Sequence, residues 1–225
     1  MMRREQIAAR RHWQSRVEQI GFTFHSIGGV YWNEAACYVF EEAEIELLES
    51  VTATLHSMCL EAVELMVRSG DYYDRLAIPE GCRSRIELSW RLHEPALYGR
   101  FDLSYNGNEP PKLLEYNADT PTSVYEAAVV QWFWLKEVRP EANQFNSIHE
   151  KLIEQWRLLL NQQSYGSTLH FSSLRQSEED FLTVEYLRDT AQQAGFETDY
   201  LAVEDVGWAA KERLFVDLKN SPMRR

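Results

Sequence analysis

Apolar side chains recur every three or four residues between Glu41 and Val67, which predicts a long amphipathic helix. Further helices are predicted over 84–92, 121–138, 146–160 and 178–194. Extended runs are predicted over 21–25, 30–32, 97–105, 112–117, 168–172, 197–202 and 214–218, with a loop over 203–213. The chain is therefore expected to be an α/β protein.

The predicted elements follow two different arrangements in the two parts of the chain. The runs 97–105 and 112–117 are separated by a Gly- and Pro-containing loop, which predicts a β-hairpin. The segments 168–172, 178–194 and 197–202 follow the β-α-β order of a parallel sheet. We therefore expect two regions, a helix-rich one over 1–165 that contains the hairpin and a β-α-β unit over 166–225.

Composition narrows the possible partners. The 225 residues are 44% hydrophobic, which is enough for a packed core, and Asp+Glu 35 against Lys+Arg 23 gives a net charge of −12. Such a charge repels phosphate backbones and anionic lipids, so we expect no nucleic-acid and no membrane partner. There are three cysteines, Cys37, Cys59 and Cys82, and no secretory leader pattern, which favours a cytoplasmic location.

The hairpin carries the candidate chemistry. Side chains alternate between the two faces of a strand, so Arg100 shares a face with Asp102, and Glu115 shares a face with Asn117. If these faces pair, two carboxylates, an amide oxygen and a guanidinium meet in one patch. Mg²⁺ prefers oxygen ligands of this kind, and a guanidinium fork suits a phosphate. The alternative is an ion pair on a solvated hairpin, and residue types alone do not exclude it.

A helix start follows the hairpin directly. Thr120 is a candidate N-cap and Pro121 fits the first helical position. The free N–H groups of a helix start bind carboxylates and phosphates. His56 lies just off the apolar stripe of the long helix and belongs to no predicted site.

The runs Y-G-R-F-D over 98–102 and K-L-L-E-Y-N-A-D-T-P-T-S over 112–123 resemble the signature of the glutathionylspermidine synthase family, in its synthetase part with a pre-ATP-grasp domain. The likeness is strongest to stand-alone synthetase-like members without an amidase domain. It implies that the β-α-β region is a Rossmann-like pre-ATP-grasp unit. It also implies that the family's ATP-grasp half has no counterpart before Arg225, so we expect the 225-residue chain alone to be inactive.

The resemblance implies roles for individual residues. Arg100 would be catalytic and contact the nucleotide phosphate, Asp102 would take part in ATP binding, and Asp102, Glu115 and Asn117 would bind Mg²⁺. Thr120 and Thr122 fall where the family carries hydroxyls for the acid substrate. Glu179 and Asp180 fall near an acidic pair for substrate recognition, although acidic residues also favour any helix start.

The implied activity is ATP-dependent amide formation through an acyl phosphate, with Mg²⁺ and ATP as cofactors. The expected substrates are a glutathione-like acid and a polyamine-like amine. The alternative is a non-catalytic metal- or carboxylate-binding module derived from such a ligase.

Overall fold

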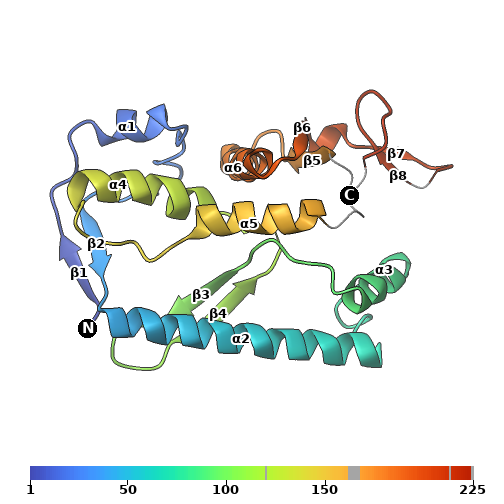
Figure 1. Ribbon diagram of the computed structural model, residues 1–225, viewed down its shortest axis with the longest axis horizontal. Coiled ribbons are helices and arrows are strands. Elements are labelled where there is room, and N and C mark those ends of the chain that lie inside the picture. The colour runs from blue at the N-terminus through green and yellow to red at the C-terminus, as the bar shows by residue number, and fades with distance from the viewer. Residues whose placement is uncertain (120, 162–167, 213, 224–225) are drawn as a thin grey trace. The chain divides into compact units, whose positions relative to one another are not determined.

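The computed structural model describes residues 1–119, 121–161, 168–212 and 214–223, and it confirms the α/β class (Figure 1). The described residues fall into two compact units. Unit 1 comprises 1–3, 38–96 and 100–117, and unit 2 comprises 4–37, 97–99 and 118–225. Strands β1 (Arg3–Gln6) and β2 (Ala36–Val39) pair where the chain passes from one unit to the other.

Unit 1 consists of two helices and a hairpin. Its elements are α2 (Glu42–Ser69), α3 (Glu80–Arg91), β3 (Arg100–Ser104) and β4 (Lys112–Asn117). The long helix begins at a capping box: the Glu41 side chain accepts from the Glu44 backbone, and the Glu41 N–H donates to Glu44 Oε2 at 2.9 Å. It ends at Gly70, whose φ of 69° stops a right-handed helix. The predicted long helix is therefore confirmed to within two residues.

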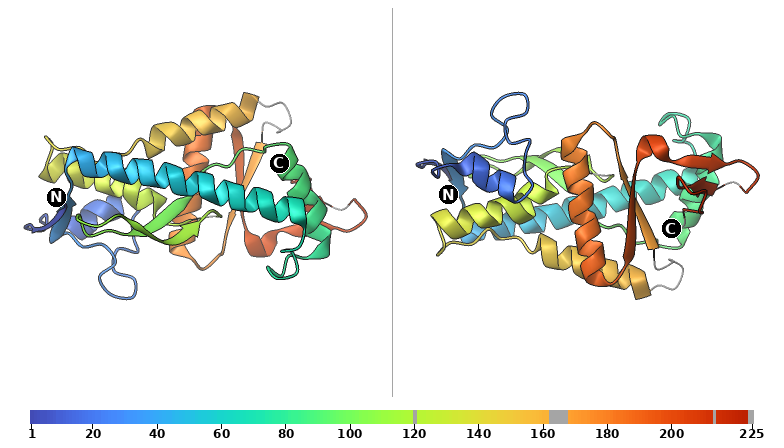
Figure 2. Two further views of the ribbon diagram at one scale, coloured as in Figure 1. Left: turned by 90° about the horizontal axis from the view of Figure 1, so that it is seen from below. Right: turned by 90° about the horizontal axis from the view of Figure 1, so that it is seen from above.

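Unit 2 contains the predicted β-α-β segment. Strands β5 (Thr168–Ser173) and β6 (Glu197–Ala202) are parallel and joined by α6 (Glu178–Ala194), as the right-hand view of Figure 2 shows. Ser177 caps α6 by accepting from the Asp180 N–H, and Gly195 at φ 110° ends it. The parallel unit is confirmed at nearly the expected boundaries.

The remaining elements of unit 2 are helical apart from a short hairpin. They are α1 (Trp13–Gln19), the π-helical turn η1 (Glu126–Val130), α4 (Gln131–Val138), α5 (Ile148–Asn161), the 3₁₀ turn η2 (Val203–Asp205), β7 (Gly207–Ala209) and β8 (Leu214–Val216). The strand β7 pairs with β8, so the prediction of a loop over 203–213 is wrong for 203–205 and 207–209.

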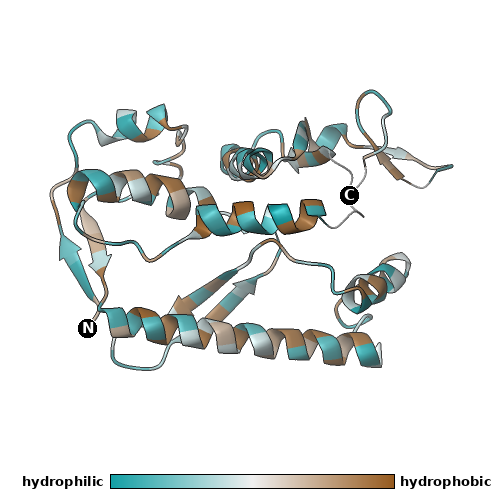
Figure 3. Cartoon of the chain, in the orientation of Figure 1, coloured by the Kyte–Doolittle hydropathy of each residue, from teal (hydrophilic) through white to brown (hydrophobic). Residues whose placement is uncertain are grey.

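The described core of unit 2 has three buried clusters. In one, Trp156 of α5 packs on Ala191 of α6 and on Phe171 of β5. The Trp156 indole N–H also donates to Thr190 Oγ1 at 3.0 Å. The apolar residues of α5 recur along the helix in Figure 3, in line with this packing. A second cluster joins Val17 to Phe22, Phe24 and Val130.

The predicted strands over 21–25 and 30–32 are not formed. The backbone bonds in this segment close turns, as from Phe22 N–H to Val17 O at 2.9 Å, and Gly28 and Gly29 have positive φ. Phe22 and Phe24 are buried because they fill the cluster against Val17, not because a strand alternates there. Alternation over so few residues does not separate a strand from a packed turn.

Candidate functional site

The hairpin pairs the four predicted side chains directly. Arg100 lies opposite Asn117, and Asp102 lies opposite Glu115. Residues directly opposite each other in an antiparallel pair share a face, and so do residues two apart on one strand. Arg100, Asp102, Glu115 and Asn117 therefore lie on one face, which confirms the predicted pairing; their roles stay a prediction.

An ion pair orients the guanidinium. Arg100 Nε donates to Asp102 Oδ1 at 2.7 Å, and a second guanidinium nitrogen lies 3.4 Å from Oδ2. The two side chains are 36% and 39% exposed, so solvent and ligands reach both of them. An exposed pair of this kind contributes about 0–1 kcal/mol to stability. The same contact is expected from the solvated-hairpin alternative, so it does not decide between the two interpretations.

The opposite face of the hairpin packs on α2. The Phe101 and Tyr116 rings stack with centroids 4.1 Å apart, and the Tyr116 hydroxyl lies 3.3 Å from His56 Nδ1 on α2. Nearer the loop, the Tyr105 hydroxyl donates to Glu44 Oε1 at 3.3 Å. Burial, followed by the nearby Cys59, raises the pKa of Tyr116. The aromatic face fixes the hairpin to the helix and leaves the polar face directed away from it. Figures 1 and 2 show the β3–β4 hairpin lying beside α2.

A β-bulge lies next to the polar face. Asp102 is opposite Glu115, but Leu103 is opposite Leu113, so Leu114 is an extra residue on β4. Leu114 is 71% exposed. The bulge interrupts the alternation of side chains along β4 between Leu113 and Glu115. Bulges occur frequently beside functional sites because they redirect side chains.

The start of the next helix differs from the prediction. Thr120 lies outside the described residues. Ser123 has φ 67°, a left-handed conformation, and Val124 is the first residue with helical structure. A right-handed helix cannot pass through such a residue, so the prediction of Pro121 as the first helical position is wrong. Pro121 is instead buried, and its carbonyl accepts from the Tyr98 hydroxyl at 2.6 Å.

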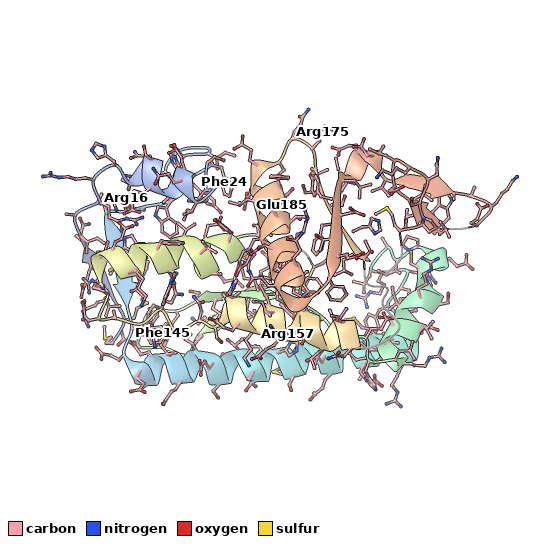
Figure 4. All side chains as sticks on the ribbon, turned by 45° about the horizontal axis from the view of Figure 1, so that its top comes forward. Arg16, Phe24, Phe145, Arg157, Arg175 and Glu185 are labelled. Atoms are coloured by element: carbon pink, nitrogen blue, oxygen red, sulfur yellow. The ribbon has the colours of Figure 1, made fainter. Side chains whose placement is uncertain are left out.

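The remaining predicted residues belong to unit 2. Thr122 is half-buried, just ahead of the helix start. Glu179 and Asp180 lie together in the first turn of α6, where acidic side chains complement the helix dipole. Arg175, in the loop ahead of α6 in Figure 4, pairs with Asp205 at 2.6 Å.

Two residues of unit 2 were not predicted. The Tyr31 hydroxyl donates to Glu126 Oε1 at 2.7 Å and lies 3.5 Å from Glu179 Oε1. Glu126 is 7% exposed, and burial, followed by the nearby Glu179 charge, raises its pKa. Burial also raises the pKa of Tyr31, to about 12. One sequence signal pointed to Glu126: it is the single charged residue in the otherwise apolar run over 124–130.

Residues 4–225 match the model of the glutathionylspermidine synthase preATP-grasp family. This chain belongs to that family. The preATP-grasp chain is 43% identical over 211 residues to a Haemophilus influenzae protein named "Putative acid--amine ligase", which covers 91% of this chain and 53% of that protein.

Two more distant relatives carry more specific names. The bifunctional glutathionylspermidine synthetase/amidase of Escherichia coli is 28% identical over 178 residues, which are 78% of the preATP-grasp chain and 28% of that enzyme. The trypanothione synthetase of Crithidia fasciculata is 31% identical over 85 residues, 37% of this chain and 13% of that enzyme. The chain thus spans about half the length of the Haemophilus relative and less than a third of the bifunctional enzyme.

The donor set of the preATP-grasp hairpin fits Mg²⁺ in kind. Asp102 and Glu115 offer carboxylate oxygens, and Asn117 offers an amide oxygen, all on one face. Within the described ranges no three His, Cys, Asp or Glu side chains gather in a way that holds a metal ion. Mg²⁺ does not require such a cage, because it commonly binds one or two carboxylates and completes its octahedron with water and phosphate oxygens.

None of the described helices is both long and apolar enough to span a bilayer.

Proposed function

We propose that this chain is the preATP-grasp part of an ATP-dependent acid–amine ligase that forms an amide through an acyl phosphate, with Mg²⁺ and ATP as its cofactors. The names of its relatives, an acid–amine ligase and a glutathionylspermidine synthetase, support the ligase class. The observation that carries the proposal is the opposed pairing of Arg100 with Asn117 and of Asp102 with Glu115 on an exposed hairpin face.

Each hairpin residue then has a role. Asp102, Glu115 and Asn117 would hold Mg²⁺, which neutralises phosphate charge when bound. Arg100 would bind a phosphate oxygen pair through its planar fork. Its ion pair with Asp102 already orients the guanidinium along the face, so little side-chain freedom is lost when a phosphate binds.

The substrates are proposed on the same basis. The hydroxyls of Thr120 and Thr122 would bind a glutathione-like acid. Glu179 and Asp180, at the start of α6, would recognise a polyamine-like amine by charge. The net charge of −12 favours a cationic partner of this kind.

The test compares two glutamates of the same hairpin. Glu115→Gln keeps the volume and removes a charged metal ligand, so in the protein encoded by the whole reading frame it should lower ATP-dependent phosphate release at least about 100-fold. Glu109→Gln is the control, because Glu109 is an exposed loop residue near Lys112 and lies outside the four-residue face. It should leave the rate unchanged.

Metal binding is measured separately by Mn²⁺ titration of the 225-residue chain, with Mn²⁺ as a paramagnetic probe for Mg²⁺. Wild-type binding that is lost in Glu115→Gln and kept in Glu109→Gln supports the site. Unchanged phosphate release and metal binding in Glu115→Gln would refute the assignment. Metal binding without ATP-dependent release in the whole protein would instead favour the non-catalytic module.

A further inference from the structure

Glu126 is a buried carboxylate that accepts a hydrogen bond from another side chain at only one of its two oxygens. It is 7% exposed, and its Oε1 accepts from the Tyr31 hydroxyl at 2.7 Å. Its Oε2 is buried and has no hydrogen-bond partner within the described parts of the chain. An unsatisfied buried polar atom costs about 1–3 kcal/mol, and more when it is charged.

The neighbours of Glu126 offer no structural reason for this cost. Val124 and Ala128, on either side of it in the sequence, are buried in an apolar cluster, where an apolar side chain would pack without an unpaired oxygen. Glu126 also begins the π-helical turn η1, a distortion that occurs frequently at functional sites. These two observations point to a role for the carboxylate other than packing.

The Tyr31 hydroxyl lies between the buried Glu126 carboxylate and the surface. Its one proton is donated to Glu126, and it also forms a hydrogen bond with the Ser123 side chain. A phenolic oxygen has two acceptor lone pairs, so one acceptor position is left. Glu179 Oε1 lies 3.5 Å from the same oxygen, and Tyr31 is 37% exposed.

The ring of Tyr31 is held in place. It packs edge-on against Phe24, with centroids 5.6 Å apart, and lies 6.1 Å from the Phe22 ring. Phe24, which is labelled in Figure 4, is buried in the cluster that contains Val17 of α1. The hydroxyl is therefore fixed between two carboxylates by a packed aromatic group.

The two carboxylates have no counter-charge close to them in the part of the chain that the structure describes. Among the described residues, neither Glu126 nor Glu179 has a Lys, Arg or His partner within salt-bridge distance. An ammonium group has three N–H donors and no acceptor, so it can donate to both the Tyr31 oxygen and Glu179. The negative charge of Glu126, on the buried side of Tyr31, would attract it as well.

We propose that Tyr31, Glu126 and Glu179 form a recognition site for an ammonium group of a substrate. Tyr31 and Glu179 would contact the ammonium, and Glu126 would act as a positioning residue that orients the Tyr31 hydroxyl and supplies charge. This assignment takes its substrates from the proposed function and adds two residues to the acidic pair of α6. The ammonium is either that of the amine substrate or the α-ammonium of the acid substrate.

The experiment measures binding to the 225-residue chain by calorimetry, without ATP or Mg²⁺. The probes are spermidine for the amine and glutathione for the acid. Glu126→Gln and Tyr31→Phe should each weaken one of these two ligands about tenfold, the loss of one charge-assisted contact. The ligand that is weakened identifies the source of the ammonium.

Glu178→Gln is the matched control. It removes the same charge from the same helical turn, but Glu178 is exposed and its side chain contacts Thr23 at 3.2 Å. It should leave both affinities within about twofold, because an exposed charge is screened. Equal affinities in wild type and in both Tyr31→Phe and Glu126→Gln would overturn the proposal. So would the absence of wild-type binding for both probes.

Folding is checked by thermal melting of each variant. If Glu126→Gln does not fold, Tyr31→Phe decides, because it removes only a hydroxyl from a partly exposed ring. Loss of both ligands together with a lowered melting point in Tyr31→Phe would show a structural role and overturn the proposal. Because no turnover is measured, a failure of this site is distinguishable from a failure of the ligase activity, which Glu115→Gln tests.

Discussion

The phosphate contact proposed for Arg100 depends on how its guanidinium is oriented. Its Nε donates to Asp102 Oδ1 and its backbone lies opposite Asn117, so the guanidinium lies along the polar face. A two-point contact with a phosphate depends on the planar guanidinium, not on positive charge alone.

Arg100→Lys should therefore impair the proposed ligase activity although it keeps the charge. A lysine ammonium cannot reproduce a two-point contact, and we expect kcat/KM for ATP to fall about tenfold or more in the whole protein. Steady-state phosphate release measures this. Arg85→Lys, on the exposed side of α3, is the control. A wild-type rate in Arg100→Lys would show that the guanidinium does not contact the nucleotide.

At the residue scale, the sequence predicted the pairing of the four hairpin residues but not the contact between Tyr31 and Glu126. Arg100, Asp102, Glu115 and Asn117 are close along two adjacent strands, so a period of two was enough to bring them together. Tyr31 and Glu126 are 95 residues apart, and their contact depends on how the Phe22 cluster packs. Pattern alone does not predict such a long-range contact.

At the scale of elements, the residues at the ends of a helix determine where that helix begins and ends. The start of α2 depends on Glu44, which accepts from the Glu41 and Met2 backbones and from the Tyr105 hydroxyl. The hydrogen bond from the Glu41 N–H is the main cause that lowers the pKa of Glu44, followed among the lowering causes by that from Met2.

This lowered pKa predicts a pH dependence of stability. The folded state favours the deprotonated Glu44, so its contribution is fully present above the unfolded-state pKa and is lost as pH falls through the folded-state pKa. Urea unfolding from about pH 7 down to about pH 3 should show the free energy of unfolding decreasing, and Glu44→Gln should make that decrease shallower. A decrease of the same slope in the variant would contradict the role of Glu44.

The end of α6 gives a second test. Gly195 has φ 110°, and a Cβ there would lie 3.3 Å from Leu160 Cδ2 on α5. Gly195→Ala should therefore lower the free energy of unfolding by about 1–2 kcal/mol, measured by urea denaturation. Gly81→Ala is the control, because Gly81 lies inside α3 with no atom near the added Cβ. It should be neutral or stabilise by up to about 1 kcal/mol.

The sequence predicted an element well where its hydrophobic pattern is long and regular, and poorly where only a few residues form the element. The helices over α2 and α6 and the parallel β5–β6 pair have long, regular patterns and strong caps. The turn at Phe22, the strand β7 and the left-handed Ser123 each depend on a few residues and on packing. The bulge at Leu114 has no local sequence signal, because Leu113 and Leu114 are identical in type.

At the scale of the whole molecule, each of the two compact units is made of stretches that are separated in the sequence. Unit 1 is assembled from three separate stretches, and the three buried clusters found in the described residues all lie in unit 2. The boundary between 165 and 166 stays a prediction. The long helix of unit 1 accordingly leaves apolar residues such as Met58 and Leu65 exposed.

The net charge predicts how salt affects the binding of the proposed substrates. A field of −12 attracts a polycation at long range and is screened by salt, with a Debye length of about 10 Å at 0.1 M. Raising NaCl from about 0.02 M to about 0.5 M should therefore weaken spermidine binding several-fold and should not weaken glutathione binding, since glutathione is anionic. Calorimetry at each salt concentration measures both. A spermidine affinity independent of salt would contradict this.

The extra leucine on β4 has a consequence for how this hairpin can change in length. It lies between the loop over 105–111 and the paired residues at the other end of the hairpin, so the two ends are aligned independently. Insertions or deletions at the tip can be absorbed there without rotating Asp102 and Glu115 to the wrong side of the ribbon. The tip can thus change in length while Arg100, Asp102, Glu115 and Asn117 keep their pairing.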